Sequence, residues 1–251
     1  MPVPIVLKSR QSPRTSSGPV LMVSEVFGPT FQGEGPSLGQ RCSFLRLGGC
    51  NLHCTWCDTP YTWDWTGRNG RKYDPRVELK PMSIGGIWSD LVQRGADMLV
   101  ISGGEPLLQQ ARLVPLLELA QAAGWWVEIE TAGTIAPLRS VVDLVSAFNV
   151  SPKLNNSGNE QSDRYRPLAL EALQDTGKVN WKFVVRAIDN LTEVDELVVR
   201  HSLKPVYIMP EGITPEQLIS HSRAIAEQVL ARGWRLTTRL HVFLYGNQRG
   251  V

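Results

Sequence analysis

Short apolar runs alternate with longer stretches of mixed polarity along most of this chain. The runs are rich in Val, Ile, Leu and Trp and predict strands, and the stretches between them have the apolar spacing of amphipathic helices. We expect strands at 20–27, 42–47, 98–101, 126–130, within 141–150, at 181–185 and at 205–209. We expect helices at 83–94, 107–123, 166–174, 190–201 and 214–232, and a last extended segment at 235–244. Such alternation predicts βαβ units and a parallel sheet.

Helix ends are marked by local signals. Ser83 and Thr214 are predicted to be N-caps, and Pro215 occupies the first turn that suits proline. Gly124 follows the helix at 107–123, at the position where a left-handed residue commonly ends a helix. These signals support the helix boundaries at 83, 123 and 214.

The number of units predicts an open barrel. About six βα units are expected from Cys42 onward, and only ~210 residues remain there, whereas a closed eight-fold barrel usually takes ~250. We therefore expect an α/β fold: an open, partial (β/α)6 TIM-like barrel with an N-terminal strand and loop and a C-terminal extended tail. We expect residues 1–18 to be a flexible extension, with a transit peptide as the alternative, and residues 19–251 to form a single domain.

Polar and glycine-rich segments directly follow the expected strands. Besides the loop at 28–36 they include GGC at 48–50, SGGEP at 102–106, ETAGT at 130–134, SPK at 151–153 and MPEG at 209–212. Because active sites of such folds lie at the carboxyl ends of the strands, these segments are expected to meet on one face. The long irregular insert at 58–80 is also expected to be functional.

Composition narrows the class of protein. The chain has 42% hydrophobic and 20% charged residues and a net charge of +2, which is typical of a soluble globular protein and argues against nucleic-acid or membrane partners. Its N-terminus lacks the apolar stretch of a secretory signal. Four cysteines in 251 residues do not make a disulfide framework, so we expect a metal site in the reducing cytoplasm.

Three of the four cysteines lie within eight positions, as Cys50, Cys54 and Cys57. A structural zinc site needs four protein ligands, whereas three cysteines on a four-iron cluster leave one iron open to a small molecule. Zinc with His53 or Cys42 as a fourth ligand is the alternative. Against it, His53 directly precedes a cysteine, so its ring should point elsewhere, and Cys42 lies in an expected strand.

The cysteine spacing followed by GGEP at 103–106 resembles the radical S-adenosylmethionine superfamily. FQGEG at 31–35, CDT at 57–59, SGGEP, ETAGT, SPK, MPEG and the LHVFLYGNQRGV ending are similar, more closely, to the 7-carboxy-7-deazaguanine synthase family. The similarity extends over residues ~20–251. This ordered set of motifs is more specific than any single one of them.

The resemblance implies an activity. Members of the family contract 6-carboxy-5,6,7,8-tetrahydropterin to 7-carboxy-7-deazaguanine and release ammonia, on the route to queuosine and related deazapurines. A [4Fe-4S] cluster cleaves S-adenosylmethionine reductively, the resulting 5′-deoxyadenosyl radical takes a hydrogen from the pterin, and Mg2+ assists the rearrangement. The resemblance also implies a homodimer and a flavodoxin- or ferredoxin-type electron donor.

Roles for individual residues follow from the same resemblance. It places Gly103, Gly104 and Glu105 at the amino end of S-adenosylmethionine, and glycines let the backbone approach a ligand closely. Ser151 and Lys153 are candidates for the carboxylate or ribose of this cofactor, although Lys153 could be a surface lysine. Trp56 and Trp63 are candidates to cover the cluster.

The substrate is expected to meet a second set of residues. The guanidinium of Arg46 suits the pterin carboxylate, with a structural ion pair as the alternative. The resemblance assigns Gln32 and Glu34 to the donor and acceptor edge of the pterin, and Thr131 and His241 to the same pocket. A lone histidine between apolar neighbours could instead be a core residue.

The metal and the rival functions complete the expectations. The family's CDT motif implies that Thr59 contacts Mg2+, although Asp58 is the better bare ligand and is expected to orient the loop. Residues 247–251 are expected to close the pocket. The alternatives are another radical enzyme of the glycyl-radical activase type and a non-enzymatic zinc-binding α/β protein.

Overall fold

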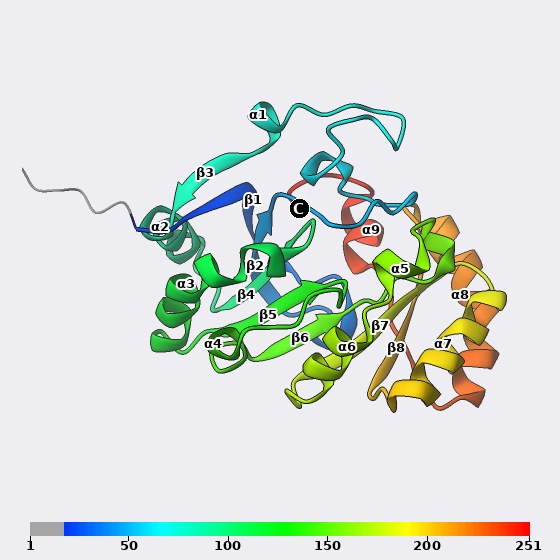
Figure 1. Ribbon diagram of the computed structural model, residues 1–251. Coiled ribbons are helices and arrows are strands. Elements are labelled where there is room, and N and C mark those ends of the chain that lie inside the picture. The colour runs from blue at the N-terminus through cyan, green and yellow to red at the C-terminus, as the bar shows by residue number, and fades with distance from the viewer. Residues whose placement is uncertain (1–17) are drawn as a thin grey trace, which may run out of the picture.

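The computed structural model describes residues 18–251, in which nine strands form one open sheet (Figure 1). Their spatial order is β3-β1-β2-β4-β5-β6-β7-β8-β9. The strands are β1 (Val20–Phe31), β2 (Arg41–Leu47), β3 (Lys80–Ser83), β4 (Met98–Gly103), β5 (Trp126–Thr131), β6 (Ala147–Val150), β7 (Val179–Val185), β8 (Val206–Pro210) and β9 (Arg235–Leu236). Pairing is antiparallel at β1 and parallel from β2 to β9. The end strands β3 and β9 do not pair with each other, so the prediction of an open, partial barrel is confirmed.

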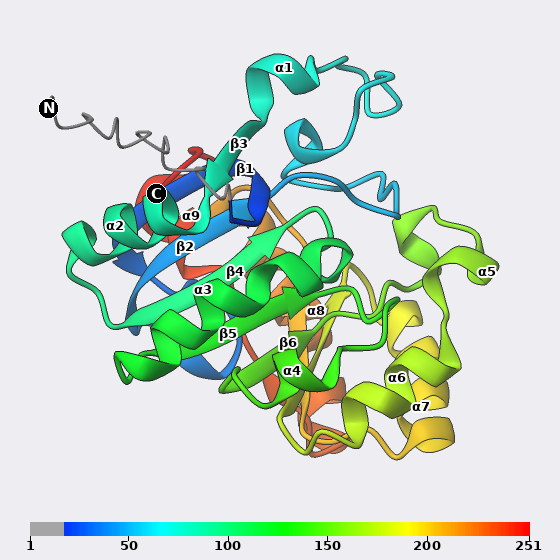
Figure 2. The same cartoon turned by 60° about the vertical axis from the view of Figure 1, so that its left-hand side comes forward.

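The longer helices pack on the outer face of this sheet (Figure 2). The helices are α1 (Pro75–Glu78), α2 (Ile84–Arg94), α3 (Gln110–Ala122), α4 (Arg139–Val142), α5 (Gln161–Arg164), α6 (Pro167–Gln174), α7 (Asp189–His201), α8 (Pro215–Ala231) and α9 (Leu240–Tyr245). The predicted caps are confirmed, because the side chains of Ser83 and Thr214 accept hydrogen bonds from Gly86 N and Gln217 N. Gly124 follows α3 with a φ of 72°, as expected of a glycine that ends a helix.

The two faces of the sheet differ in polarity. On β5, Val127 and Ile129 belong to the apolar core beneath the helices, whereas Glu128 and Glu130 point to the concave face. Strand β7 repeats the pattern, with Phe183 in the core and the buried Lys182 on the concave face. Since alternate residues of a strand face opposite sides, helices cover one face and a polar interior lies on the other.

Some predicted boundaries are wrong. Strand β1 continues to Phe31, four residues into the expected loop, with register shifts between Phe27 and Thr30. The expected extended segment at 235–244 is strand β9 followed by helix α9. Its mixture of Thr, Val and Phe resembles a strand, but Leu240 N donates to the carbonyl of Gly33 at 2.8 Å, and this contact docks a short helix against a distant loop.

Other elements were not expected from the sequence. Residues 80–83 form the edge strand β3. It pairs with β1, which lies about sixty residues earlier in the chain. In the expected strand within 141–150, only β6 is extended, and α4 precedes it. The polar segment at 154–163 contains a 3-10 turn at Asn155–Ser157 and part of α5.

Within residues 18–251, no helix has both the length and the apolar character needed to cross a bilayer. The prediction of a flexible extension concerns residues 1–18, all but the last of which lie outside the described residues.

Candidate active site

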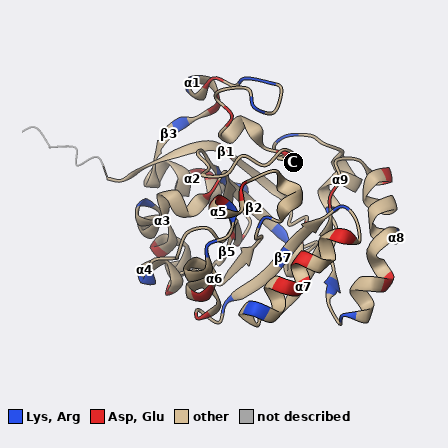
Figure 3. Cartoon of the chain, turned by 45° about the vertical axis from the view of Figure 1, so that its right-hand side comes forward, with Lys and Arg blue, Asp and Glu red and all other residues tan. Residues whose placement is uncertain are grey.

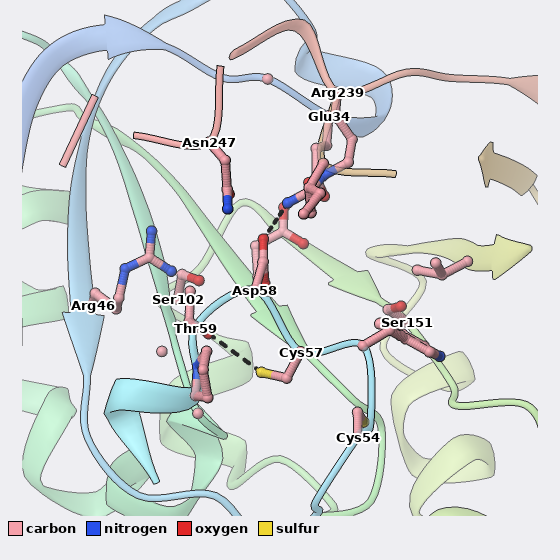
Figure 4. Close-up of a pocket in the computed structure, with 18 of the residues that line it drawn as sticks. Glu34, Arg46, Cys54, Cys57, Asp58, Thr59, Ser102, Ser151, Arg239 and Asn247 are labelled. Atoms are coloured by element: carbon pink, nitrogen blue, oxygen red, sulfur yellow. Dashed lines mark hydrogen bonds and ion pairs between the residues drawn. The ribbon is translucent and has the colours of Figure 1, made fainter. Parts of the chain in front are cut away.

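A cavity of about 910 Å³ opens at the carboxyl ends of the strands (Figure 4). Residues from both halves of the sheet, the N-terminal loop, the cysteine loop and the C-terminal tail line it. Of the residues predicted to bind cluster, cofactor, metal or substrate, those that line the cavity are Gln32, Glu34, Arg46, Cys50, Cys54, Cys57, Thr59, Gly103, Gly104, Thr131, Ser151, Lys153 and His241. The expected convergence of the strand-end segments is therefore confirmed.

The cysteine loop follows β2 and forms one end of the cavity. Its three thiols pack with Leu52 and Ala132, and burial raises their pKa values, that of Cys50 to about 12. Cys42 is fully buried in the sheet, as predicted for a core residue, and His53 is exposed with its ring edge-on to Trp63. Neither alternative zinc ligand therefore joins the group.

The donor set fits an iron–sulfur cluster. Among the described residues, no three His, Cys, Asp or Glu side chains converge closely enough to hold a single metal ion, although the three thiols share one corner of the cavity. Buried thiolates need positive charge beside them, and a multi-iron cluster supplies it to three cysteines that are spread more widely than the ligands of one zinc.

The GGE segment at the end of β4 packs against the cysteine loop. A Cβ on Gly104 would overlap the carbonyl oxygen of Gly49 and approach the Cβ of Cys50 to 2.8 Å, so glycine is required there. Gly104 N donates to Leu47 O at 3.1 Å, and Glu105 N donates to Gly49 O at 2.8 Å. This backbone therefore fixes the position at which the cysteine loop leaves the sheet.

Glu105 lies behind the wall of the cavity and does not line it. Its carboxylate is fully buried and accepts hydrogen bonds from Leu107 N (3.0 Å), Thr131 Oγ1 (2.8 Å) and Ala132 N (2.8 Å). Burial raises its pKa despite these bonds. The carboxylate thus positions the β5 loop beside the cluster corner, and the contact with S-adenosylmethionine that the resemblance implies for Glu105 stays a prediction.

A buried charge network forms the opposite end of the cavity. Lys182 Nζ donates to Glu34 Oε2 at 2.5 Å and to Glu130 Oε2 at 2.7 Å. Gln32 Nε2 donates to Glu130 Oε1 at 3.2 Å and to Glu128 Oε2 at 3.4 Å. Burial alone would raise the pKa of Glu34, but the charges of Lys182 and Arg239 hold it well below its usual range. The pKa of Glu130 is raised, because this carboxyl is buried and lies beside the negative Glu34. Glu34 is therefore the firmly ionised member.

Arg239 connects this network to the cysteine loop. Its guanidinium donates to Glu34 Oε1 at 3.2 Å, to the carbonyl of Gly212 at 2.8 Å, and to Asp58 (Figure 4). Arg239 also counteracts the burial of Asp58 and lowers the pKa of its carboxyl. The expectation that Asp58 orients its loop agrees with this contact, and three loops far apart in sequence are fastened to one side chain.

Arg46 projects from β2 into the cavity between these two ends (Figure 4). Its Nε donates to Glu25 at 2.9 Å, which is the ion pair considered as an alternative from the sequence. Within residues 18–251, no hydrogen-bond acceptor meets its two terminal nitrogens. The Nε of Arg46 is therefore held by Glu25, whereas its two terminal nitrogens are free to donate two hydrogen bonds to one carboxylate.

The C-terminal tail closes one side of the cavity, as expected. Arg249 donates to Glu25 and, at 2.7 Å, to Glu78, and its guanidinium lies 3.8 Å from the centre of the Tyr61 ring. Asn247 from the same tail points into the cavity (Figure 4). Glu25 thus orients both Arg46 and the tail.

The remaining predicted residues lie around the middle of the cavity. Lys153 Nζ donates to Ser151 Oγ at 3.0 Å and lies over the ring of Trp56, so it is not a plain surface lysine. Thr59 is buried with its hydroxyl 3.7 Å from Cys57 Sγ. His241 is half-buried on α9, and burial lowers its pKa, so its ring is neutral at pH 7.

Comparison with known proteins identifies the family of this chain. A family model described as the radical SAM superfamily matches residues 45–223. A 7-carboxy-7-deazaguanine synthase from Pyrobaculum aerophilum is 34% identical over 94% of this chain and 99% of its own length. The chain belongs to the 7-carboxy-7-deazaguanine synthase family of radical SAM proteins.

Further relatives in this family agree. The synthase from Bacillus subtilis is 29% identical over 91% of this chain and 98% of its own length. The crystal structure of QueE from Escherichia coli is 26% identical, with a TM-score of 0.68 over 88% of this chain and 95% of that one. A [4Fe-4S] cluster and S-adenosylmethionine are the cofactors of this family, and the donor set described above fits them.

Several residues of the synthase site were missed in the sequence. Lys182 had a readable signal, because a lysine inside the buried run WKFVV is costly unless it is paired. Glu25 lies on a partly exposed strand, Arg239 directly precedes helix α9, and Asn159 lies in a polar loop. Local patterns carry no signal for these three, because their partners lie between 21 and 205 residues away.

Proposed function

We propose that this chain contracts 6-carboxy-5,6,7,8-tetrahydropterin to 7-carboxy-7-deazaguanine, with release of ammonia. The observation that carries the proposal is one continuous cavity with a three-cysteine corner at one end and the Glu34 network and Arg46 at the other. When bound, the cluster and S-adenosylmethionine supply one-electron chemistry that removes a hydrogen atom from the substrate. The chain supplies the position of the substrate relative to that chemistry.

The substrate end is proposed to read the pterin by charge and hydrogen bonding. Glu34 is ionised and fixed by Lys182 and Arg239, so its carboxylate is suited to accept from N–H donors of the heterocycle. The outer edge of Arg46 faces the cavity and suits the substrate carboxylate. Neutral His241 lies beside Glu34 and Gly33, where its ring can donate or accept a hydrogen bond.

The cofactor end is proposed to hold S-adenosylmethionine between three strand ends. The backbone at Gly103 and Gly104, the Ser151–Lys153 pair and Thr131 line this part of the cavity. The Lys153 ammonium suits a carboxylate. We also propose that the Thr59 hydroxyl contributes to a Mg2+ site together with substrate oxygens, because Arg239 already occupies Asp58.

An anaerobic assay with a chemical reductant, S-adenosylmethionine and the carboxytetrahydropterin tests the reaction. The expected result is 7-carboxy-7-deazaguanine with one ammonia released per turnover. Formation of 5′-deoxyadenosine without the deazaguanine would leave the superfamily in place and overturn the substrate. A colourless protein that carries one zinc would overturn the radical chemistry altogether.

Arg46→Ala gives a second test of the substrate end. The cluster spectrum should not change, and kcat/KM should fall at least tenfold, since a charge-assisted hydrogen bond contributes ~1.5–3 kcal/mol. Arg46→Lys should recover little, because a single ammonium cannot form the two-pronged contact. Loss of the cluster in Arg46→Ala would mean that Arg46 and Glu25 serve only to hold β1 and β2 together.

We propose that an acidic, flavodoxin- or ferredoxin-type protein delivers the electron at the loop before α1. This loop carries Arg68, Arg71 and Lys72 with no acid from 65 to 72, and Figure 3 shows basic residues there. Asn69 Nδ2 donates to the carbonyl of Cys54 at 2.9 Å, which fixes the loop against the cysteine loop. Reversing the three charges should slow reduction by flavodoxin at low salt and leave reduction by dithionite unchanged. Equal rates with flavodoxin would exclude this surface.

We also propose that the catalytic unit is a single domain of residues 19–251 that pairs with a second copy. Leu38, Trp126 and Leu236 are each at least 40% exposed. Ser37 and Trp126 both donate to Glu128, which brings the loop that carries Leu38 close to Trp126 at the amino end of the central strand β5. Sedimentation equilibrium should give twice the 27.9 kDa chain mass, and Trp126→Glu should shift it toward the monomer.

A further inference from the structure

Every cysteine sulfur of the cluster corner accepts a hydrogen bond from an N–H group. The donors are of different kinds: one belongs to the backbone and the other two to side chains. The pairs are Leu52 N to Cys50 Sγ at 3.4 Å, Asn159 Nδ2 to Cys54 Sγ at 3.2 Å, and Trp63 Nε1 to Cys57 Sγ at 3.3 Å. The reaction described above uses neither of the two side-chain donors.

The orientation of the Asn159 amide is decided by its other contacts. Its Oδ1 accepts a hydrogen bond from the backbone N–H of His53 at 2.8 Å, and a backbone N–H can only donate. The oxygen must therefore face His53, and the NH2 group must face Cys54 and Ser157 Oγ, the latter at 3.1 Å. The contact with sulfur is consequently a donated hydrogen bond.

The segment that carries Asn159 is itself fastened to the cysteine loop. Thr55 N donates to Ser157 O at 2.9 Å, and Trp56 Nε1 donates to Asn156 O at 2.9 Å. A Cβ on Gly158 would come to 2.7 Å from the Thr55 side chain, so the two segments are in close contact. Asn159 is thus held in place and does not reach the sulfur by chance.

Trp63 is held equally well. The residue is 6% exposed, its ring packs edge-on against His53 at 5.1 Å, and an indole nitrogen can only donate. The 3-10 turn Pro60–Thr62 directly precedes Trp63, which lies six positions after Cys57 in the sequence. Its N–H dipole is therefore fixed on the sulfur of Cys57.

We propose that Trp63 and Asn159 set the reduction potential of the cluster by donating hydrogen bonds to two of its cysteine sulfurs. The proposal rests on the cluster assigned to these cysteines above. The potential of an iron–sulfur cluster depends on hydrogen bonds to its sulfurs, because an N–H dipole stabilises the more negative, reduced state. Removing either donor makes the cluster harder to reduce and moves its potential to a more negative value.

The test is an EPR-monitored redox titration of the anaerobically reconstituted protein without S-adenosylmethionine. The variants are Trp63→Phe, which keeps the packed ring, Asn159→Leu, which keeps the volume, and the double variant. Trp65→Phe is the matched control, because it also removes one indole N–H from the same segment as Trp63, and within residues 18–251 that N–H donates to no sulfur. Iron and sulfide per chain are measured in parallel, and EPR reports only the loaded fraction.

Both single variants are expected to titrate at more negative potentials than the unaltered protein, the double variant at the most negative, and Trp65→Phe at the original value. Unchanged potentials in both single variants would overturn the proposal, as would an equal shift in Trp65→Phe. Absence of a reduced-cluster signal in the unaltered protein would instead overturn the cluster assignment itself, so the two failures are distinguishable.

Discussion

Replacing Lys182 with methionine removes the cation between Glu34 and Glu130 while keeping most of the side-chain volume. Lys182 is 3% exposed and forms charge-assisted hydrogen bonds of 2.5 and 2.7 Å. Each such bond contributes ~1.5–3 kcal/mol, and removing one member of a buried ion pair costs ~3–5 kcal/mol. We therefore expect Lys182→Met to lower the free energy of unfolding by ~4 kcal/mol at neutral pH, a large share of the ~5–15 kcal/mol typical of a domain.

The loss should depend on pH with a definite sign. Without Lys182, Glu130 is a buried carboxyl beside the negative Glu34, and its pKa rises further above the ordinary value. A group whose pKa is raised in the folded state contributes stability that is present at low pH and is lost as the pH rises through that pKa. The deficit of Lys182→Met relative to the unaltered protein should therefore be smaller at about pH 5 than at about pH 7.5.

Urea unfolding of the cluster-free protein, followed by circular dichroism at both pH values, measures these quantities. Lys182→Met/Glu130→Gln should regain part of the loss, because Glu34 still pairs with Arg239. Lys80→Met, at an exposed position on the edge strand β3, is the control and should change stability by ~0.5 kcal/mol or less. A loss below ~1 kcal/mol in Lys182→Met, or one independent of pH, would refute the reasoning.

Two further predictions concern the cysteine loop. Gly104→Ala should displace that loop and at least halve the iron bound per chain on reconstitution, since its Cβ would overlap Gly49; Gly85→Ala, in open space on α2, should bind iron normally. Arg239→Gln should keep the cluster but lower kcat/KM at least tenfold, because Glu34 and the cysteine loop are no longer tied together; Arg232→Gln, which breaks an ion pair with Asp195 on the surface, should not. Equal effects in each pair would contradict these roles.

The alternation of strands and helices was readable because each unit is local. The run MLVI at 98–101 is apolar along its whole length, WKFVV at 181–185 is apolar except for Lys182, and the caps at Ser83 and Thr214 are short-range signals. The open barrel followed from the number of such units. Pairings between distant segments, such as β3 with β1, could not be predicted, because no local pattern in either strand indicates which other strand it pairs with.

The cluster corner was likewise predictable. Cys50, Cys54 and Cys57 are close in sequence, so their spacing alone indicated a shared metal group with an open position. The sequence also placed the other motifs at strand ends, and parallel strands bring those ends to one face. The buried charge network at that face could be predicted only in part, from Lys182 as an isolated lysine in an apolar strand.

By itself, the sequence determined the order of the elements, the grouping of three cysteines in one loop and the face on which the site lies, because all three depend on patterns over a few residues. Only the tertiary structure decided which charged and polar side chains are buried and with which partners they pair. It placed Glu34 between Lys182 and Arg239, fixed Arg46 at Glu25, and aimed Asn159 at a cysteine sulfur 105 residues away. Electrostatic energies depend on distance and burial in three dimensions, and no local pattern of residues encodes them.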